Sequence, residues 1–93
     1  MIMAIPSTNR PRLARQARLN WDPVREQHVL LAPEGVTVLN QTGATILGLC
    51  DGERTFAEVV EELRGKYDRV ADEEVRDFLA RLAAKRLVEL GDE

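Results

Sequence analysis

A strand-rich stretch near the middle of the chain reads His28-Val29-Leu30-Leu31-Ala32-Pro33-Glu34-Gly35-Val36-Thr37-Val38-Leu39. Aliphatic and β-branched residues fill both of its ends, and such residues favour strands. Pro33 presets the backbone angle that a tight turn requires, and Gly35 suits the exit of that turn. The stretch therefore predicts a hairpin with strands over residues 27–32 and 36–39.

A further strand is predicted immediately before this hairpin. Over residues 17–22 the apolar Ala17, Leu19 and Trp21 alternate with polar residues, which is the period of a half-buried strand. The segment that follows begins Asp22-Pro23, a typical start of a turn. We therefore expect a three-stranded antiparallel meander.

Helices are predicted after the meander, because beyond Asn40 the apolar spacing changes from two to about 3.6. Asn40 or Thr42 can cap a short first helix, and Gly52 suits the left-handed conformation that follows a helix end. Thr55 and Glu58 have the spacing of a capping box. This box begins a second helix, whose apolar stripe is Phe56, Val59, Val60, Leu63 and Tyr67.

A third helix is predicted over residues 72–86. Asp72-Glu73-Glu74 at its start and Lys85-Arg86 at its end complement the helix dipole. Its apolar stripe consists of Val75, Phe78, Leu79, Leu82 and Ala83. The apolar residues 87–90 that follow fit either a last helical turn or a short strand.

These elements predict an α+β fold with the outline of a winged helix-turn-helix, in which the meander packs against three helices. We expect a single domain over residues 17–90, since 93 residues leave no room for a second core. Residues 1–16 are expected to form a flexible arginine-bearing tail that could shield the first strand, and residues 91–93 a disordered end.

Residues that carry catalytic or metal chemistry are few. The single Cys50 and single His28 cannot form a disulfide or a structural zinc site. Cys50 with His28 is the minimum for cysteine catalysis, but Cys50 lies on the apolar side of the first helix and is expected to be a small buried hydrophobe. We therefore expect no enzyme activity, cofactor or metal. The lone thiol and the lack of a membrane-spanning stretch indicate a cytoplasmic protein.

The charge distribution disfavours binding to nucleic acid. The net charge is −3, and only residues 1–19, with four arginines and no acid, could attract a polyanion. The third helix would place its acidic end in a DNA groove. A winged-helix DNA-binding protein and a structural subunit of an enzyme complex remain as alternatives.

The predicted strand over residues 36–39 is a candidate binding surface. It contains no Lys, Pro or inward charge of the kind that protects an edge strand. An extended peptide could pair with such an edge through its main chain, with alternate side chains entering pockets beside the strand. Alternatively the tail, the last few residues or a second copy of the chain covers this edge.

Several segments together resemble, in order and spacing, the pyrroloquinoline quinone (PQQ) biosynthesis protein D family, PqqD. They are Pro11-Arg12-Leu13, Trp21-Asp22, His28-Val29-Leu30-Leu31-Ala32-Pro33-Glu34, Leu39-Asn40, Ile46-Leu47, Cys50-Asp51-Gly52 and Thr55. The resemblance extends over residues 11–90. One departure is Arg86, where the family pattern favours Gly before Leu87-Val88, so the resemblance leaves the end of the third helix open.

The resemblance implies a non-enzymatic peptide chaperone of the kind called a RiPP recognition element. Such a protein binds a ribosomal precursor peptide (PqqA-like) and presents it to a radical S-adenosylmethionine enzyme (PqqE-like) that crosslinks a Glu and a Tyr. The peptide would lie beside the third strand, opposite the third helix. The implied contacts are Val36, Thr37, Val38, Leu39 and Asn40 on the strand and Val75, Arg76, Leu79 and Ala83 on the helix.

Two further expectations concern pockets and assembly. Pockets lined by Val38, Val75 and Leu79 are expected to select the peptide and its register. A detached tail and short hinge turns would permit a strand-exchanged homodimer as well as a monomer.

Overall fold

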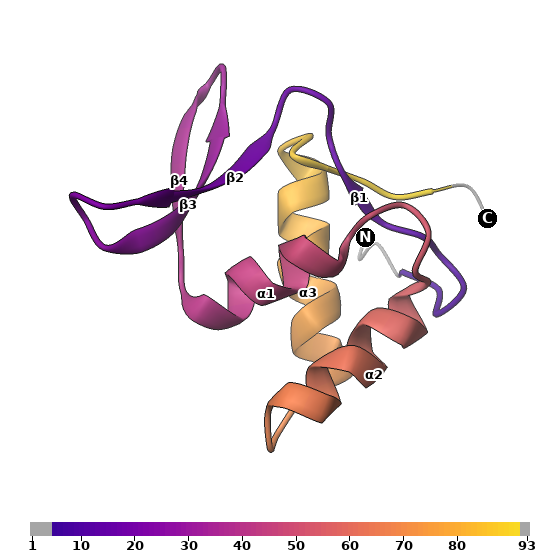
Figure 1. The fold of residues 1–93 in the computed structure, drawn as a ribbon. Helices are drawn as coiled ribbons and strands as arrows, with labels where there is room; N and C mark the ends of the chain where they lie inside the picture. The colour runs from indigo at the N-terminus through magenta and orange to yellow at the C-terminus, as the bar shows by residue number, and fades with distance from the viewer. Residues whose placement is uncertain (1–4, 92–93) are drawn as a thin grey trace.

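The computed structural model describes residues 5–91, which form an α+β fold (Figure 1). Its elements are β1 (Arg12–Leu13), β2 (Arg18–Asp22), β3 (Gln27–Ala32), β4 (Gly35–Leu39), α1 (Gln41–Leu49), α2 (Phe56–Lys66), α3 (Asp72–Ala84) and β5 (Val88–Glu89). The β2–β3–β4 sheet lies on one side of the helices, and β1 lies on the other (Figure 1). The predicted fold class, a meander packed against three helices, is confirmed.

The meander has the strand order β2-β3-β4, and its register gives the two faces different environments. Leu30 pairs with Leu19 on one side and Thr37 on the other, and Leu30 is buried against the helices. Because successive side chains alternate between faces, Val36 and Val38 lie on the opposite face, where they are 52% and 48% exposed. The sheet thus has one packed face and one open, partly apolar face.

The starts of α1 and α2 are capped by local side chains. The Oδ1 atom of Asn40 accepts a hydrogen bond of 2.7 Å from the backbone N–H of Gly43, so Asn40 rather than Thr42 caps α1. Thr55 accepts a bond from the Glu58 amide, while the Glu58 carboxylate accepts one from the Thr55 amide. The capping box predicted for α2 is therefore confirmed.

The hydrophobic core lies where the three helices meet the inner face of the sheet. Apolar side chains of all three helices contribute to it, together with residues of the sheet, the N-terminal segment and residues 87–88. The most deeply buried aliphatic and aromatic side chains include Leu30, Leu47, Phe56, Val59, Leu63 and Leu79.

The N-terminal segment differs from the expectation. Residues 5–16 are not a free tail: β1 pairs with β5, Ile5 is 1% exposed, and the Asn9 carbonyl accepts a 2.7 Å bond from the Phe56 amide. Burial of scattered apolar residues holds the segment, and its partners lie far away in sequence, so no local period reveals it. The segment does not pair with β2, and it is not the detached tail that was one of the two grounds for expecting a strand-exchanged dimer. Residues 1–4 of the predicted tail lie outside the described residues.

The C-terminal end is also held by pairing. Residues 87–90 contain the short strand β5 rather than a last helical turn, and Arg12 forms a 2.8 Å ion pair with Glu89 across the β1–β5 ladder. The Asn9 side-chain amide donates a hydrogen bond to the carbonyl of Gly91. Gly91 therefore belongs to the packed domain, and residues 92–93 of the predicted disordered end lie outside the described residues.

The third helix ends two residues earlier than predicted, at Ala84. Arg86 has a φ of +64°, in the left-handed region that glycine adopts without a steric penalty. Its amide donates a 2.9 Å bond to Ala83, and its carbonyl accepts a 3.1 Å bond from Gln16. This turn directs the chain into β5, and it explains why Gly suits the position.

Replacing Arg86 by Gly is expected to raise the free energy of unfolding by about 0.5–1 kcal/mol, because the left-handed backbone loses its Cβ penalty. Chemical denaturation measures this change. The neighbouring Lys85 has a φ of −91°, so Lys85→Gly should lower stability by a similar amount. An Arg86→Gly variant no more stable than the parent would contradict this backbone conformation.

Candidate functional site

The outer edge of β4 has no strand partner among residues 5–91. Within the described part of the chain β3 is the only strand that pairs with β4, and the N-terminal segment pairs instead with β5. Within residues 5–91, therefore, neither the N-terminal segment nor the C-terminal end covers the edge of β4. The edge is open for pairing.

The hairpin geometry shows which residues of β4 offer main-chain groups to this edge. Ala32 pairs with Gly35 across a two-residue turn, and such a turn closes on a hydrogen-bonded pair. Since hydrogen-bonded and non-hydrogen-bonded pairs alternate in an antiparallel ladder, Val36 and Val38 belong to the second kind. Their N–H and C=O groups are directed away from β3, toward the open edge.

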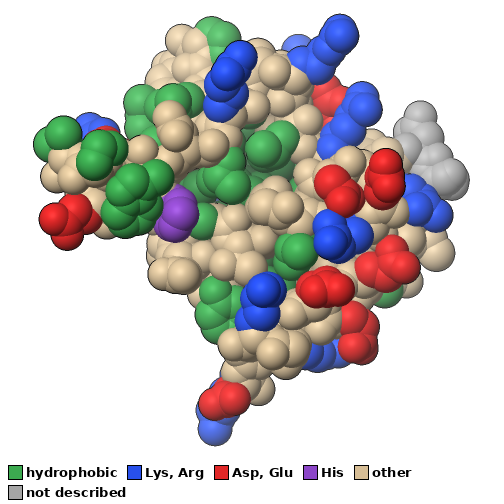
Figure 2. Space-filling model, in the orientation of Figure 1, with side chains coloured by type: hydrophobic (Ala, Val, Ile, Leu, Met, Phe, Trp, Pro, Cys, Tyr) green, Lys and Arg blue, Asp and Glu red, His purple; other side chains and the backbone are tan. Residues whose placement is uncertain are grey.

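A groove runs between β4 and α3. Its main cavity has a volume of about 600 Å³, and a second cavity of about 350 Å³ adjoins it beside Gly35 and Val36. Thr37 and Lys85 line both cavities, so the two form one continuous groove along β4. In the orientation of Figure 1, hydrophobic side chains gather over the β2–β4 sheet and continue toward the helices (Figure 2).

Helix α3 presents two rows of side chains to this groove. Spacings of three and four residues place each row along one line of the helix surface. The floor consists of the apolar Val75, Phe78 and Leu82. The rim consists of the charged, exposed Glu74, Asp77 and Arg81, continued by Lys85 directly after the helix.

The structure places all five expected strand residues at the groove. Thr37, Val38, Leu39 and Asn40 line the main cavity, and Val36 lines the smaller one. On α3, Val75 also lines the main cavity. Val38 and Val75 therefore line the same cavity, whereas Leu79, the third residue expected at these pockets, does not line it.

Three expected residues of α3 lie outside the groove lining: Arg76, Leu79 and Ala83. Arg76 donates a 2.9 Å bond to the carbonyl of Ile5, and its guanidinium lies 4.7 Å from the centre of the Phe56 ring. Leu79 is fully buried in the core. These residues follow a different line of the helix, which faces the N-terminal segment and α2, so their expected place in the groove is corrected.

Phe78 is one of the groove residues that the sequence did not predict, together with Leu82, Tyr67 and the charged rim. It belongs to the predicted apolar stripe of α3, but unlike Leu79 it is only partly buried. A Cβ atom on Gly43 would lie 3.1 Å from the Phe78 ring, so the glycine allows the ring to pack closely against α1. Tyr67 lines the same cavity, with its hydroxyl 3.0 Å from the Thr45 hydroxyl.

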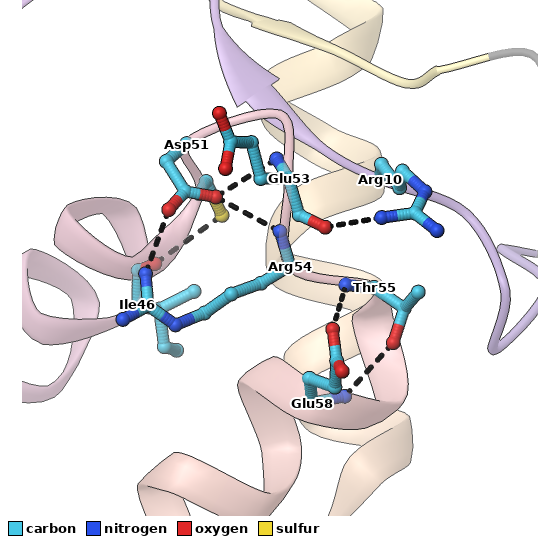
Figure 3. A network of polar contacts seen from close by, with 8 residues as sticks. Arg10, Ile46, Asp51, Glu53, Arg54, Thr55 and Glu58 are labelled. Carbon is cyan, nitrogen blue, oxygen red and sulfur yellow. Dashed lines mark hydrogen bonds and ion pairs between the residues drawn. The ribbon is translucent and has the colours of Figure 1, made fainter.

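A network of polar contacts holds the turn between α1 and α2 and the start of α2 (Figure 3). Bonds from the Arg54 and Glu53 amides hold the pKa of Asp51 below its usual value. Burial raises the pKa of the Cys50 thiol to about 12, and the thiol donates to the Ile46 carbonyl at 3.2 Å. A thiol with this pKa is a poor nucleophile at neutral pH. Within residues 5–91, no cluster of three potential metal-binding side chains occurs.

Comparison with known families identifies the chain. The model of the family described as Coenzyme PQQ synthesis protein D (PqqD) matches residues 27–88. The chain belongs to the PqqD family. The matched residues run from β3 to β5 and so contain both walls of the groove.

Relatives in the PqqD family are similar to this protein over nearly the whole chain. The protein named PqqA binding protein from Azotobacter vinelandii is 39% identical over 86% of this chain and 89% of its own length. The solution structure of the PqqD part of PqqCD from Methylobacterium extorquens, described as a stand-alone RiPP recognition element, is 37% identical. Its TM-score is 0.78, over 92% of this chain and 95% of that one.

A more distant structure shares the fold. TbiB1, solved in complex with the TbiA(beta) leader peptide, is 24% identical with a TM-score of 0.70, over 84% of this chain and 94% of that one. Among the described residues, no helix is long and apolar enough to cross a membrane.

Proposed function

We propose that this PqqD family member binds the precursor peptide of PQQ biosynthesis, PqqA, as a strand added to the open edge of β4. The observation that carries the proposal is an unpaired strand edge beside a groove with an apolar floor. The name PqqA binding protein for a relative 39% identical over most of the chain supports the ligand.

Main-chain pairing holds the peptide. The outward N–H and C=O groups of Val36 and Val38 pair with the guest, which demands little of its sequence. Side chains of alternate guest residues lie over Phe78 and the floor of the groove. The remaining side chains cover Val36 and Val38 on the open face, where both valines are about half exposed. The two apolar surfaces thus select the peptide and fix its register.

Capture is followed by delivery. Ordering a flexible peptide costs free energy, so we expect micromolar affinity, which allows release to a second protein. The chain itself is not the catalyst: it presents PqqA to a radical S-adenosylmethionine enzyme, which crosslinks a Glu and a Tyr of the peptide. The buried Cys50 thiol is in keeping with this non-catalytic role.

Titration with synthetic PqqA, followed by backbone amide NMR, tests the binding site. We expect the largest shifts at residues 35–40 and in the groove-facing half of α3, and micromolar affinity by calorimetry. A DNA duplex added under the same conditions serves as the control and should produce no site-specific shifts. Shifts confined to the β1–β5 side of the molecule, or no binding of PqqA, would contradict the proposal.

A further inference from the structure

The rim of α3 carries charges of opposite sign at its two ends. Glu74 and Asp77 stand toward the start of the helix, and Arg81 and Lys85 toward its end, and all four are exposed and line the groove. None of them forms an ion pair with another described residue, although Asp77 and Arg81 are four residues apart. These charges are therefore free to interact with a ligand.

The helix dipole by itself does not explain why charged side chains line this rim. Asp72 and Glu73 already place acids in the first turn of α3 and do not line the groove. The rim charges instead recur at spacings of three and four residues along the single helix line that borders the cavity. They are placed to meet whatever lies in the groove.

The groove consequently has a basic end and an acidic end. Lys85 shares the smaller cavity with Gly35 and Val36, at the start of β4. Glu74 lines the main cavity together with Tyr67 and Val70, which belong to the C-terminal end of α2 and the loop after it. The direction of β4 thus runs from the basic end toward the acidic end.

Two charges from other elements oppose this polarity without cancelling it. Arg69 lines the main cavity, and Glu34 lines the smaller one beside Lys85. With Arg69 included, the acidic end of the groove keeps one net negative charge. With Glu34 included, the basic end keeps one net positive charge. The order of charge along the groove is preserved.

We propose that the groove selects its peptide by the order of charges along it. This inference rests on the proposed function: a guest paired antiparallel with β4, the slightly more stable arrangement, runs from the acidic end to the basic end. The preferred segment therefore carries a basic side chain N-terminal to an acidic one. The base lies near Glu74 and Asp77, and the acid near Arg81 and Lys85. Charge complementarity of this kind fixes direction and register more than it adds affinity.

Charge reversal at each end tests the proposal, with synthetic PqqA as the probe and calorimetry at low salt as the readout. Arg81→Glu/Lys85→Glu and Glu74→Lys/Asp77→Lys are each expected to weaken binding about five- to tenfold, and less at 0.5 M salt. The matched control is Arg64→Glu/Lys66→Glu. It makes the same charge change as the first variant at exposed sites of α2 that do not line the groove, and it should leave affinity within twofold.

Two altered peptides, one without acidic and one without basic side chains, identify the interacting charges. PqqA with its Asp and Glu replaced by Asn and Gln should bind the parent chain more weakly, and it should no longer distinguish the parent from Arg81→Glu/Lys85→Glu. PqqA with its Lys and Arg replaced by Gln should likewise no longer distinguish the parent from Glu74→Lys/Asp77→Lys. Affinity losses that persist unchanged with these neutral peptides would overturn the proposal.

A nitroxide label on PqqA tests the direction. Placed at the peptide N-terminus, it should broaden amide signals near Glu74 more than those near Gly35; the opposite gradient would overturn the charge order. Normal binding by both reversal variants, with binding still lost when the β4 edge is blocked, would overturn this inference alone. Failure of the parent chain to bind PqqA would overturn the proposed function as well.

Discussion

The Val38→Pro variant is expected to bind the PqqA peptide about a hundredfold more weakly than the parent while remaining folded. Proline has no N–H and therefore removes a donor from the open edge of β4. The N–H of Val38 is directed away from β3, so the hairpin loses no bond of its own. The side chain of Val38 is 48% exposed, and a proline ring can occupy that space.

The expected loss of affinity follows from the hydrogen bond that the guest peptide can no longer form with residue 38. An intermolecular hydrogen bond contributes about 0.5–1.5 kcal/mol, and a buried acceptor left without a partner costs about 1–3 kcal/mol more. The proline ring also occupies the space in which the guest backbone would lie. A total near 3 kcal/mol corresponds to roughly a hundredfold change in the dissociation constant.

Two controls make this experiment specific. Val38→Thr keeps the N–H and the branched shape, so it should change affinity by less than about fivefold. Circular dichroism and thermal melting should show that Val38→Pro is folded. Unchanged PqqA affinity in a folded Val38→Pro variant would refute pairing at this edge, whatever the behaviour of the groove.

Leu79→Ala is expected to lower the free energy of unfolding by about 3 kcal/mol. Leu79 is 0% exposed at the centre of the core, and truncating such a leucine removes apolar contacts and leaves a cavity. For a domain of this size the change corresponds to a fall in melting temperature of roughly 12–24 °C. Affinity for PqqA, measured on the protein that remains folded, should not change, because Leu79 does not line the groove.

The neighbouring Phe78→Ala variant is the matched control, with the opposite expectation. Phe78 is only partly buried and lies on the groove floor, so its truncation should cost PqqA affinity about tenfold or more and reduce stability less than Leu79→Ala does. Denaturation and calorimetry on both variants separate the two roles. Equal losses of affinity in both variants would show that the division of α3 between core and groove is wrong.

The sequence predicted the elements that depend on near neighbours. Aliphatic and β-branched residues with the Pro33-Glu34-Gly35 turn predicted the hairpin, and the spacing of Thr55 and Glu58 predicted the start of α2; both are confirmed. These features depend on residues within a few positions of one another. The lack of protective residues on β4 is also a local property, so the sequence could suggest an open edge, but it could not decide whether another segment covers that edge.

Contacts between distant segments could not be predicted in the same way. The apolar stripe of α3 is wide enough to face both the core and the groove, so Arg76 and Leu79 were expected in the groove while Phe78 was not. The N-terminal segment has no hydrophobic periodicity that would reveal its packing. It is held by Phe56 and β5, which lie far away in sequence. Such partners become apparent only when the chain is folded.

The sequence by itself therefore determined the type and approximate extent of the meander and the three helices, because capping, turn chemistry and periodicity act over a few residues. Only the tertiary structure decided how α3 is divided between core and groove, where the N-terminal segment packs, and which charges border the groove. The physical reason is that burial depends on the summed packing of segments far apart in the chain, which no single stretch of sequence encodes.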